Sequence, residues 1–369
     1  MSGTTGPVGV GIIGAGVIAA QYLGQLTTYP DIDVRALGDL RPEAAAARAE
    51  EHGIAGHGPV EAVLDDPEIE IVVNLTIPAA HHAVSRDILS AGKHVWSEKP
   101  LTTTREDAAD LLEHARRQGL RIGGAPDTVL GAGVQSALRA VRAGEIGEPR
   151  SALAQFRSPG PESWHPNPDF LFQAGAGPLY DMGPYYLTTL VLAYGPVVSV
   201  SAVGSRSRDT RTIGSGPRAG ESFAVEVPTR VQGLLRFADG ASAAVEFSFD
   251  DALDRPHVLE LAGSAGTIAL PDPNQFSGVS GIAMRGEDDW TERGPVGAVG
   301  GRGLGTLEMA RALRAGRPHR LTGELAAHVL DVMISLEEAT TVDGAVTVSS
   351  TVTAPDLLDA DFDPHLSTL

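Results

Sequence analysis

The first forty residues carry the pattern that most restricts the fold of this chain. An apolar run, Val8 to Ile13, leads into Gly14-Ala15-Gly16-Val17-Ile18-Ala19, and the residues that follow are typical of a helix. Asp39 closes a second apolar run about twenty residues further on. Strand, glycine-rich turn, helix, strand and acid in this order predict a βαβ unit of the kind that binds a dinucleotide.

Each residue of this pattern has a physical task. Gly14 allows a sharp turn, Gly16 lets a pyrophosphate approach the backbone, and Ala19 keeps the helix close to the sheet. The phosphates would lie at the helix N-terminus, where free N–H groups and the helix dipole favour anions. Asp39 would accept hydrogen bonds from the ribose hydroxyls and repel a 2′-phosphate, which favours NAD; Arg41 could partner a 2′-phosphate and leaves NADP possible.

The hydrophobic pattern divides the chain near residue 125. Before it, continuous apolar strands alternate with amphipathic helices, which predicts a parallel sheet covered on both faces. The expected strands are Val8–Ile13, Val34–Asp39, Ile69–Leu75, His94–Ser97 and Arg121–Gly124. We therefore expect an α/β protein whose residues 1–125 form a doubly wound Rossmann domain that binds NAD(P).

The second part, residues 126–369, has a different pattern. Helices are expected over Gly131–Ala143 and Leu179–Tyr194, and period-two strands run from Val197 to Leu270 without crossover helices. Residues 272–303 are rich in glycine and predict a surface loop, before two closing helices, Gly305–Arg314 and Glu324–Asp343, which could pack back on the first domain. This predicts an α+β domain for substrate binding and oligomerisation, with a large open, mostly antiparallel sheet.

Composition excludes several classes of function. The formal net charge of −19 argues against nucleic acid or membrane as a partner. Without cysteine the chain forms no disulfide or thiolate site, and its 11 scattered histidines lead us to expect no metal. No apolar run is long enough to span a bilayer, and the N-terminus lacks a signal peptide pattern, so we expect a cytoplasmic protein.

A lysine follows the fourth of these strands, in the sequence Glu98-Lys99-Pro100. Ligands of doubly wound sheets bind beyond the carboxyl ends of the strands, so Lys99 is expected in the crevice where a nicotinamide would lie. Pro100 restricts its backbone. From there Lys99 could polarise a carbonyl or exchange a proton with a hydroxyl; the alternative is a surface lysine in a loop.

Three stretches together make the sequence similar to a known family. Gly14–Ala19, Asn74–His81 and Ala91–Pro100 resemble the Gfo/Idh/MocA family, the relatives of glucose–fructose oxidoreductase and inositol dehydrogenase. The resemblance implies NAD(P)-dependent oxidation or reduction of sugars, cyclitols or related polyols, with Lys99 catalytic. It also implies a homodimer or homotetramer, because the large C-terminal sheet often forms the oligomer interface in this family. The residues then expected at the cofactor are Gly14, Gly16, Val17, Ile18, Asp39, Arg41, Thr76, Pro78, His81, Glu98 and Lys99.

The second motif of the family is altered in this chain. Members commonly have D-x-G-x-H-x-x-D, whereas this chain has Asp181-Met182-Gly183-Pro184-Tyr185-Tyr186-Leu187-Thr188. Tyr185 therefore occupies the histidine position, and it could exchange the proton itself, particularly beside a lysine. Alternatively Tyr185 only shapes the pocket and Lys99 works alone. Asp181 could orient Lys99, contact substrate or cap a helix.

Two further segments are candidates for substrate contact. Trp164 and His165 lie in a Pro-rich loop; the indole could pack on a sugar, and the imidazole could replace the missing motif histidine, although a plain surface loop is the alternative. Asp127 follows the last strand of the first domain, where it could contact substrate or cap the Gly131 helix. Lys99, Asp181 and Tyr185 complete the expected substrate site.

Two alternatives to a dehydrogenase or reductase remain open at this stage. Within the resemblance, bound NAD could oxidise a sugar transiently and so permit elimination or glycoside cleavage without net redox change. A non-catalytic protein that senses NAD and a sugar is the other, favoured by the altered motif and disfavoured by the intact Lys99.

Overall fold

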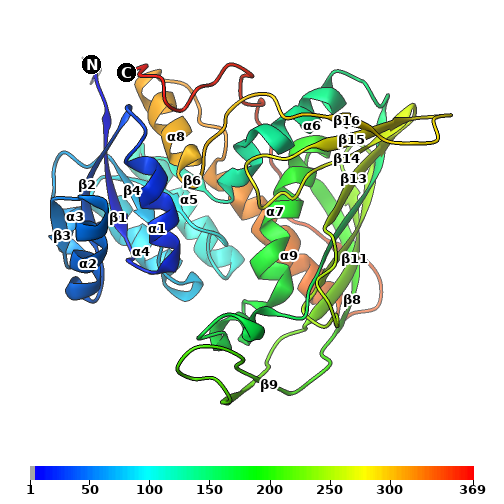
Figure 1. Cartoon of the computed structure of the whole chain (residues 1–369), viewed down its shortest axis with the longest axis horizontal. Coiled ribbons are helices and arrows are strands. Elements are labelled where there is room, and N and C mark those ends of the chain that lie inside the picture. The colour runs from blue at the N-terminus through cyan, green and yellow to red at the C-terminus, as the bar shows by residue number, and fades with distance from the viewer. Residues whose placement is uncertain (1–4) are drawn as a thin grey trace.

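The computed structural model describes residues 5–369. Its first part is a six-stranded parallel sheet in the order β3-β2-β1-β4-β5-β6, the doubly wound order that the sequence predicts. Helices cover both faces of this sheet, which explains why its central strands are apolar throughout (Figure 1). The strands are β1 (Val8–Ile13), β2 (Ile32–Gly38), β3 (Gly56–Gly58), β4 (Ile71–Asn74), β5 (His94–Ser97) and β6 (Ile122–Gly124).

The helices of this part begin and end at sequence signals. Thr104 caps the longest of them by accepting a hydrogen bond from the Asp107 N–H, and Gly119, with a φ of +67°, ends it. These helices are α1 (Val17–Leu26), α2 (Pro42–His52), α3 (Glu61–Leu64), α4 (Pro78–Ser90) and α5 (Arg105–Gln118). Each crossover brings the carboxyl ends of the parallel strands to one edge, where the candidate residues gather.

The second part is built on a nine-stranded sheet in the order β16-β15-β14-β13-β7-β12-β11-β8-β17. β7 and β12 run parallel and the other neighbouring pairs are antiparallel, so the prediction of a large, mostly antiparallel sheet is confirmed. The strands are β7 (Pro149–Arg157), β8 (Val197–Ser205), β11 (Arg230–Phe237), β12 (Ser242–Ser248), β13 (Val258–Gly263), β14 (Gly266–Ala269), β15 (Ser280–Met284), β16 (Thr291–Arg293) and β17 (Val346–Thr347).

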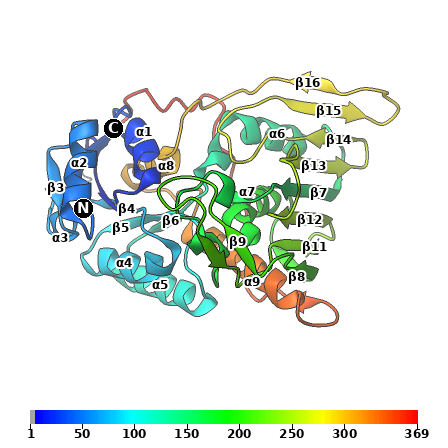
Figure 2. The ribbon, with the colours of Figure 1, turned by 60° about the horizontal axis from the view of Figure 1, so that its bottom comes forward.

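Helices cover one face of this sheet and leave the other open. Figure 1 shows α7 (Gly177–Tyr194) and α9 (Gly323–Ala339) between the two sheets, whereas the outer face of the large sheet has no covering layer. α6 (Ala132–Arg142) packs beside α7, after a short 3-10 turn, Asp127–Leu130. A separate two-stranded ribbon, β9 (Thr210–Thr212) and β10 (Ser222–Ala224), lies in front of α7 in Figure 2.

The prediction of a surface loop over residues 272–303 is wrong in part. β15 and β16 lie within it and extend the sheet edge, because antiparallel pairing with β14 stabilises residues whose local pattern is weak. The last residues of this stretch, 300–303, pack on α1: a Cβ at Gly301 would lie 2.6 Å from the side chain of Gln25. This close contact brings the segment into the crevice between the two sheets.

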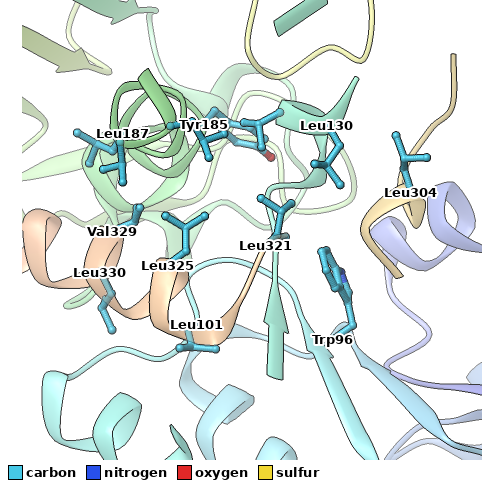
Figure 3. Close-up of a cluster of buried hydrophobic side chains, with 14 of the residues drawn as sticks. Trp96, Leu101, Leu130, Tyr185, Leu187, Leu304, Leu321, Leu325, Val329 and Leu330 are labelled. Carbon is cyan, nitrogen blue, oxygen red and sulfur yellow. The ribbon is translucent and has the colours of Figure 1, made fainter. Parts of the chain in front are cut away.

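The two closing helices pack back on the first part, as the sequence suggests. α8 (Leu304–Arg314) contacts the Rossmann sheet, and its Arg311 pairs with Asp31 at 2.7 Å. Figure 3 shows the shared core, with Trp96 of β5 on the side of Leu304 of α8, Leu325 of α9 toward Tyr185 of α7, and Leu330 of α9 toward Leu101. The two sheets thus share one continuous hydrophobic core. Within residues 5–369, no helix has the length and apolar character needed to cross a membrane.

Candidate active site between the two sheets

The turn after β1 has the conformation that a dinucleotide site requires. Gly14 has a φ of +108°, and a Cβ there would lie 2.7 Å from the carbonyl group of Leu75, so only glycine fits. At Gly16, the N-cap of α1, a Cβ would meet no atom of the described residues within 4 Å. The space over the positive end of α1 is therefore open to a phosphate.

Asp39 lies at the end of β2 and holds this turn in place. Its Oδ2 accepts from the Ala15 N–H at 2.8 Å and its Oδ1 accepts from the Arg41 N–H at 2.9 Å. Each carboxylate oxygen keeps a lone pair for a ribose hydroxyl. The Arg41 side chain is exposed, with its Nε 4.0 Å from Asp39 Oδ1.

Three large apolar side chains stand exposed where strands β1, β2 and β4 end. The exposed fractions are 81% for Val17, 93% for Leu40 and 62% for Ile77. Exposed apolar groups that gather around a crevice mark a ligand surface. Leu40 and Ile77 were not predicted, although each directly follows a strand end. Together with the glycine turn and Asp39, these residues fit the flat rings and phosphates of a dinucleotide.

Lys99 faces away from the bulk solvent and is held by one residue of α7. Its Nζ donates to the Asp181 Oδ1 at 2.7 Å and to the Asp181 carbonyl oxygen at 2.8 Å. Burial by itself lowers the pKa of Lys99, but the nearby charges, Asp181 first, outweigh this effect and raise it above its ordinary value. The ammonium is thus protonated at neutral pH and keeps one N–H free of Asp181.

Asp181 lies inside α7, which begins at Gly177, so the alternative that it caps this helix is wrong. Pro184 in the next turn has no N–H to donate to the Tyr180 carbonyl. The Tyr180 side chain donates its hydroxyl to Glu337 of α9 at 2.6 Å. These contacts fix the segment of α7 that presents Asp181 to Lys99.

Tyr185 is one turn further along α7 and lies beside Lys99. The Lys99 Nζ is 5.5 Å from the centre of the Tyr185 ring, and the side chain is almost fully buried. Burial raises the pKa of Tyr185 although the charges of Lys99 and Arg302 oppose this, so the phenol is protonated at neutral pH. Arg302, a residue that the sequence did not single out, donates from Nη2 to the Tyr185 hydroxyl at 3.3 Å.

These side chains line a cavity of about 390 Å³ between the two parts of the chain. Nine of the predicted residues lie on its wall: Ile18, Thr76, Pro78, Glu98, Lys99, Trp164, His165, Asp181 and Tyr185. Residues that were not predicted also lie on the wall, among them Thr103, Phe170 and Gln173. The cavity opens where the strands of the Rossmann sheet end, as expected for a doubly wound fold.

The loop that carries Trp164 and His165 covers one side of the cavity. Trp164 is 67% exposed, and the His165 ring packs edge-on between Trp164 and Phe170, with 5.6 Å between ring centres in each pair. His165 Nδ1 accepts from the Asn167 N–H at 3.0 Å, and burial lowers its pKa. The imidazole is therefore neutral at pH 7, with Nε2 carrying its proton.

Glu98 is buried and supports the backbone of Lys99. Its Oε1 accepts from the Tyr22 hydroxyl at 2.8 Å, and its Oε2 accepts from the Lys99 N–H at 3.0 Å. Tyr22 in turn accepts from the Trp96 indole at 3.3 Å. This buried chain of hydrogen bonds fixes the backbone of Lys99; Tyr22 gave no sequence signal because an aromatic residue on a buried helix face is usually core.

Two predicted contacts are corrected by the structure. Asp127 is fully buried and does not line the cavity. Its Oδ2 accepts from the N–H groups of Gly303 and Gly305, so it caps α8; it neither caps the Gly131 helix nor contacts a substrate.

His81 is also buried, with Nδ1 2.6 Å from the Pro100 carbonyl oxygen and Nε2 3.0 Å from that of Thr76. It ties two loops together and offers no free nitrogen to a cofactor.

In the part of the chain that the structure describes, no group of three or more His, Cys, Asp or Glu side chains is arranged to hold a metal ion. The cavity wall instead carries the Lys99 ammonium, the Tyr185 phenol and the His165 imidazole, which are groups that exchange protons. The arrangement therefore suits proton exchange at a substrate oxygen beside a bound dinucleotide.

Comparison with known proteins identifies the family of this chain. Residues 8–124 match the model of an oxidoreductase family with an NAD-binding Rossmann fold, and residues 134–269 match the GFO/IDH/MocA C-terminal domain. A dTDP-3,4-didehydro-2,6-dideoxy-alpha-D-glucose 3-reductase of Streptomyces antibioticus is 32% identical over 267 residues, 70% of this chain and 74% of that protein. A 1,5-anhydro-D-fructose reductase of Ensifer adhaerens is 29% identical over 220 residues, 58% of this chain and 65% of that protein.

The fold comparison extends over nearly the whole chain. A solved structure of levoglucosan dehydrogenase in complex with NADH and L-sorbose has a TM-score of 0.80 and 21% identity, covering 93% of this chain and 99% of that one. At this identity the likeness establishes the fold. With both family models matched in order and a relative above 30% identity, this chain belongs to the Gfo/Idh/MocA family of NAD-binding oxidoreductases.

Proposed function

We propose that the protein moves a hydride between nicotinamide and a secondary alcohol or ketone carbon of a sugar, cyclitol or related polyol. The observation that carries this proposal is the cluster of Lys99, Asp181 and Tyr185 on one cavity wall, with the Lys99 ammonium held at 2.7 Å from the Asp181 carboxylate. The cofactor, when bound, supplies or accepts the hydride at its nicotinamide ring, and the protein supplies orientation and charge.

Each of the three residues has a separate task in this proposal. Lys99 uses its remaining N–H to polarise the substrate oxygen, and Asp181 keeps the ammonium aimed at the cavity. In reduction, the Tyr185 O–H gives its proton to the oxygen of the ketone as the carbon gains a hydride; in oxidation, the phenolate oxygen takes the proton from the hydroxyl. His165, whose ring also lies on the wall, is the alternative proton donor.

A polyol as substrate is supported by the relatives and by the cavity. Named relatives act on sugars, among them the dTDP-linked hexose and 1,5-anhydro-D-fructose reductases. Trp164 presents an exposed indole face beside polar groups, the combination that binds the alternating C–H and O–H surfaces of a sugar ring. Asp39 at the end of β2 favours NAD over NADP, because its carboxylate would repel a 2′-phosphate.

A substrate panel tests the proposal. Sugars, inositols and their keto forms would be offered with NAD or NADP at 340 nm, and turnover of at least one polyol is the expected result. Tyr185→Phe should then lose most of kcat with little change in KM, and His165→Ala should retain it. Activity in Tyr185→Phe but not in His165→Ala would transfer the proton role to His165, and binding of NAD and a sugar without turnover would favour a sensor.

Assembly and location belong to the same proposal. We infer a homodimer or homotetramer joined through the open face of the large sheet, where Val203 and Leu234 are 66% and 63% exposed on neighbouring strands. Apolar side chains on an uncovered face favour association. A Leu234→Glu variant should shift the mass measured by light scattering toward the monomer.

A cytoplasmic location is proposed because reducing compartments hold the NAD pool on which the reaction depends.

A further inference from the structure

Arg302 reaches from the C-terminal part of the chain to the candidate acid. Its Nη2 donates to the Tyr185 hydroxyl at 3.3 Å and to the Asn274 Oδ1 at 2.9 Å, while its Nε donates to the Gln21 Oε1 of α1 at 2.9 Å. The guanidinium carbon also lies 5.9 Å from the centre of the Tyr185 ring. One side chain thereby connects α1, α7 and the loop before β15.

The backbone around Arg302 is held tightly. A Cβ at Gly303, whose φ is +106°, would lie 2.8 Å from the side chain of Leu26, so the segment follows the surface of α1 without a gap. The Gly303 N–H donates to the buried Asp127 at 2.7 Å, and the Gly301 N–H donates to the Tyr29 hydroxyl at 3.2 Å. Arg302 is therefore projected from a fixed backbone, as a positioned group requires.

Arg302 forms no direct ion pair in the part of the chain that the structure describes, although the buried carboxylates of Glu98 and Asp127 act on it from further away. Its three hydrogen-bond acceptors, on Gln21, Asn274 and Tyr185, are neutral, and within residues 5–369 no carboxylate oxygen lies within 4.0 Å of its guanidinium. Many other arginines in the chain pair with acids, for example Arg105 with Asp331 and Glu338. A half-buried cation that faces neutral acceptors favours any negative charge that forms beside it.

We propose that Arg302 is a positioning residue that holds the Tyr185 hydroxyl and stabilises the phenolate during proton exchange. The inference rests on the proposed role of Tyr185. Because Nη2 fills one lone pair of the hydroxyl oxygen, the O–H bond is left to point at a substrate oxygen. When that proton moves to the substrate, the negative charge forms 3.3 Å from the guanidinium, and Lys99 lies 5.5 Å from the ring. Arg302 and Lys99 then both stabilise the negative charge of the phenolate.

The test replaces Arg302 and restores its charge. Arg302→Ala should lower kcat roughly 10- to 100-fold, as expected for a charged hydrogen bond to the reacting group, while KM and the affinity for NADH stay close to wild type. Added guanidinium ion should restore part of the lost kcat in a saturable manner, and Arg302→Lys should retain more activity than Arg302→Ala. Arg105→Ala is the matched control: it also removes an arginine that bridges the two parts, and guanidinium should leave its activity unchanged.

A second measurement isolates the route through Tyr185. In the oxidative direction, loss of the cation should move the limb of the pH–rate profile that reports the phenol to higher pH. In a Tyr185→Phe background, Arg302→Ala should have little further effect on kcat. An equal loss in both backgrounds, or no rescue and no pH shift, overturns the inference while the proposed function stands. Wild-type turnover by Tyr185→Phe removes the proposed role of Tyr185 and the inference together.

Discussion

Replacing Asp127 by asparagine should make the protein less sensitive to rising pH. Asp127 is fully buried, its Oδ2 accepts from the Gly303 and Gly305 N–H groups, and its Oδ1 has no hydrogen-bond partner among residues 5–369. Burial raises its pKa from 3.8 to about 6, although Arg302 and the two N–H groups oppose the shift. The folded state therefore binds a proton more tightly than the unfolded state, and this group lowers stability as pH rises from about 4 to about 6.

The magnitude follows from the two pKa values. A difference of about 2 units corresponds to about 3 kcal/mol of unfolding free energy at pH 7.5, relative to a neutral side chain at the same place. By the same relation, roughly half of this cost is already present at pH 5. Asparagine keeps an acceptor for the two N–H groups and carries no charge, so Asp127→Asn should gain roughly 1 to 2 kcal/mol over wild type between pH 5 and pH 7.5.

Urea unfolding of both proteins at the two pH values gives this double difference, with reversibility checked by dilution from urea. Other titrating groups contribute equally to both proteins and cancel. Asp127→Ala serves as the control. It removes the oxygen that accepts from both N–H groups, and this loss should destabilise the protein by about 1 to 3 kcal/mol at either pH. A double difference of zero or of opposite sign would refute the assignment of Asp127 as a strained buried carboxylate. If the Asp127 variants lost substrate affinity without any change in stability, Asp127 would instead belong to the substrate site.

Three further outcomes are expected at the site. Lys99→Ala should lower kcat roughly 10²- to 10⁴-fold with unchanged NADH affinity by fluorescence titration, and near-normal turnover would exclude Lys99 from the chemistry. Asp39→Ser should raise the kcat/KM ratio for NADP over NAD, with Arg41 as the available cation; a wild type that already prefers NADP tenfold would contradict the argument. Trp164→Ala should raise KM for the polyol about 2- to 10-fold at constant kcat, and an unchanged KM would show that the indole does not contact substrate.

The sequence predicts the elements whose stability is local or whose burial is complete. The central Rossmann strands are apolar throughout, so their pattern is clear without knowledge of their partners. β7 (Pro149–Arg157) was not predicted, because it is only partly buried and depends on pairing with β12 and β13, which follow it far along the chain. β16 is exposed along its whole length and forms only as an edge on β15.

The same distinction applies to the site. Lys99 could be predicted because a rule of the fold places residues after a parallel strand in the crevice. For Asp127 the sequence left open a substrate contact or a cap on the nearest helix, whereas the helix that it caps begins at Leu304 and is brought to it only by the packing of α8 on the Rossmann sheet. A cap from a distant segment leaves no local spacing signal.

Arg302 shows how that packing connects fold and chemistry. Only glycine fits on either side of Arg302, because α1 lies directly against Gly301 and Gly303. Asp127, which accepts from the Gly303 N–H, is buried because α8 covers it. The charge of Arg302 in turn opposes the raised pKa of Asp127 and that of Tyr185. A change that neutralises Asp127 should therefore leave Arg302 in place and remove one negative charge near it. The electrostatic potential at Tyr185 then becomes more positive, which favours the phenolate. Asp127→Asn should accordingly move the phenol limb of the pH–rate profile to lower pH, opposite in sign to the shift expected for Arg302→Ala.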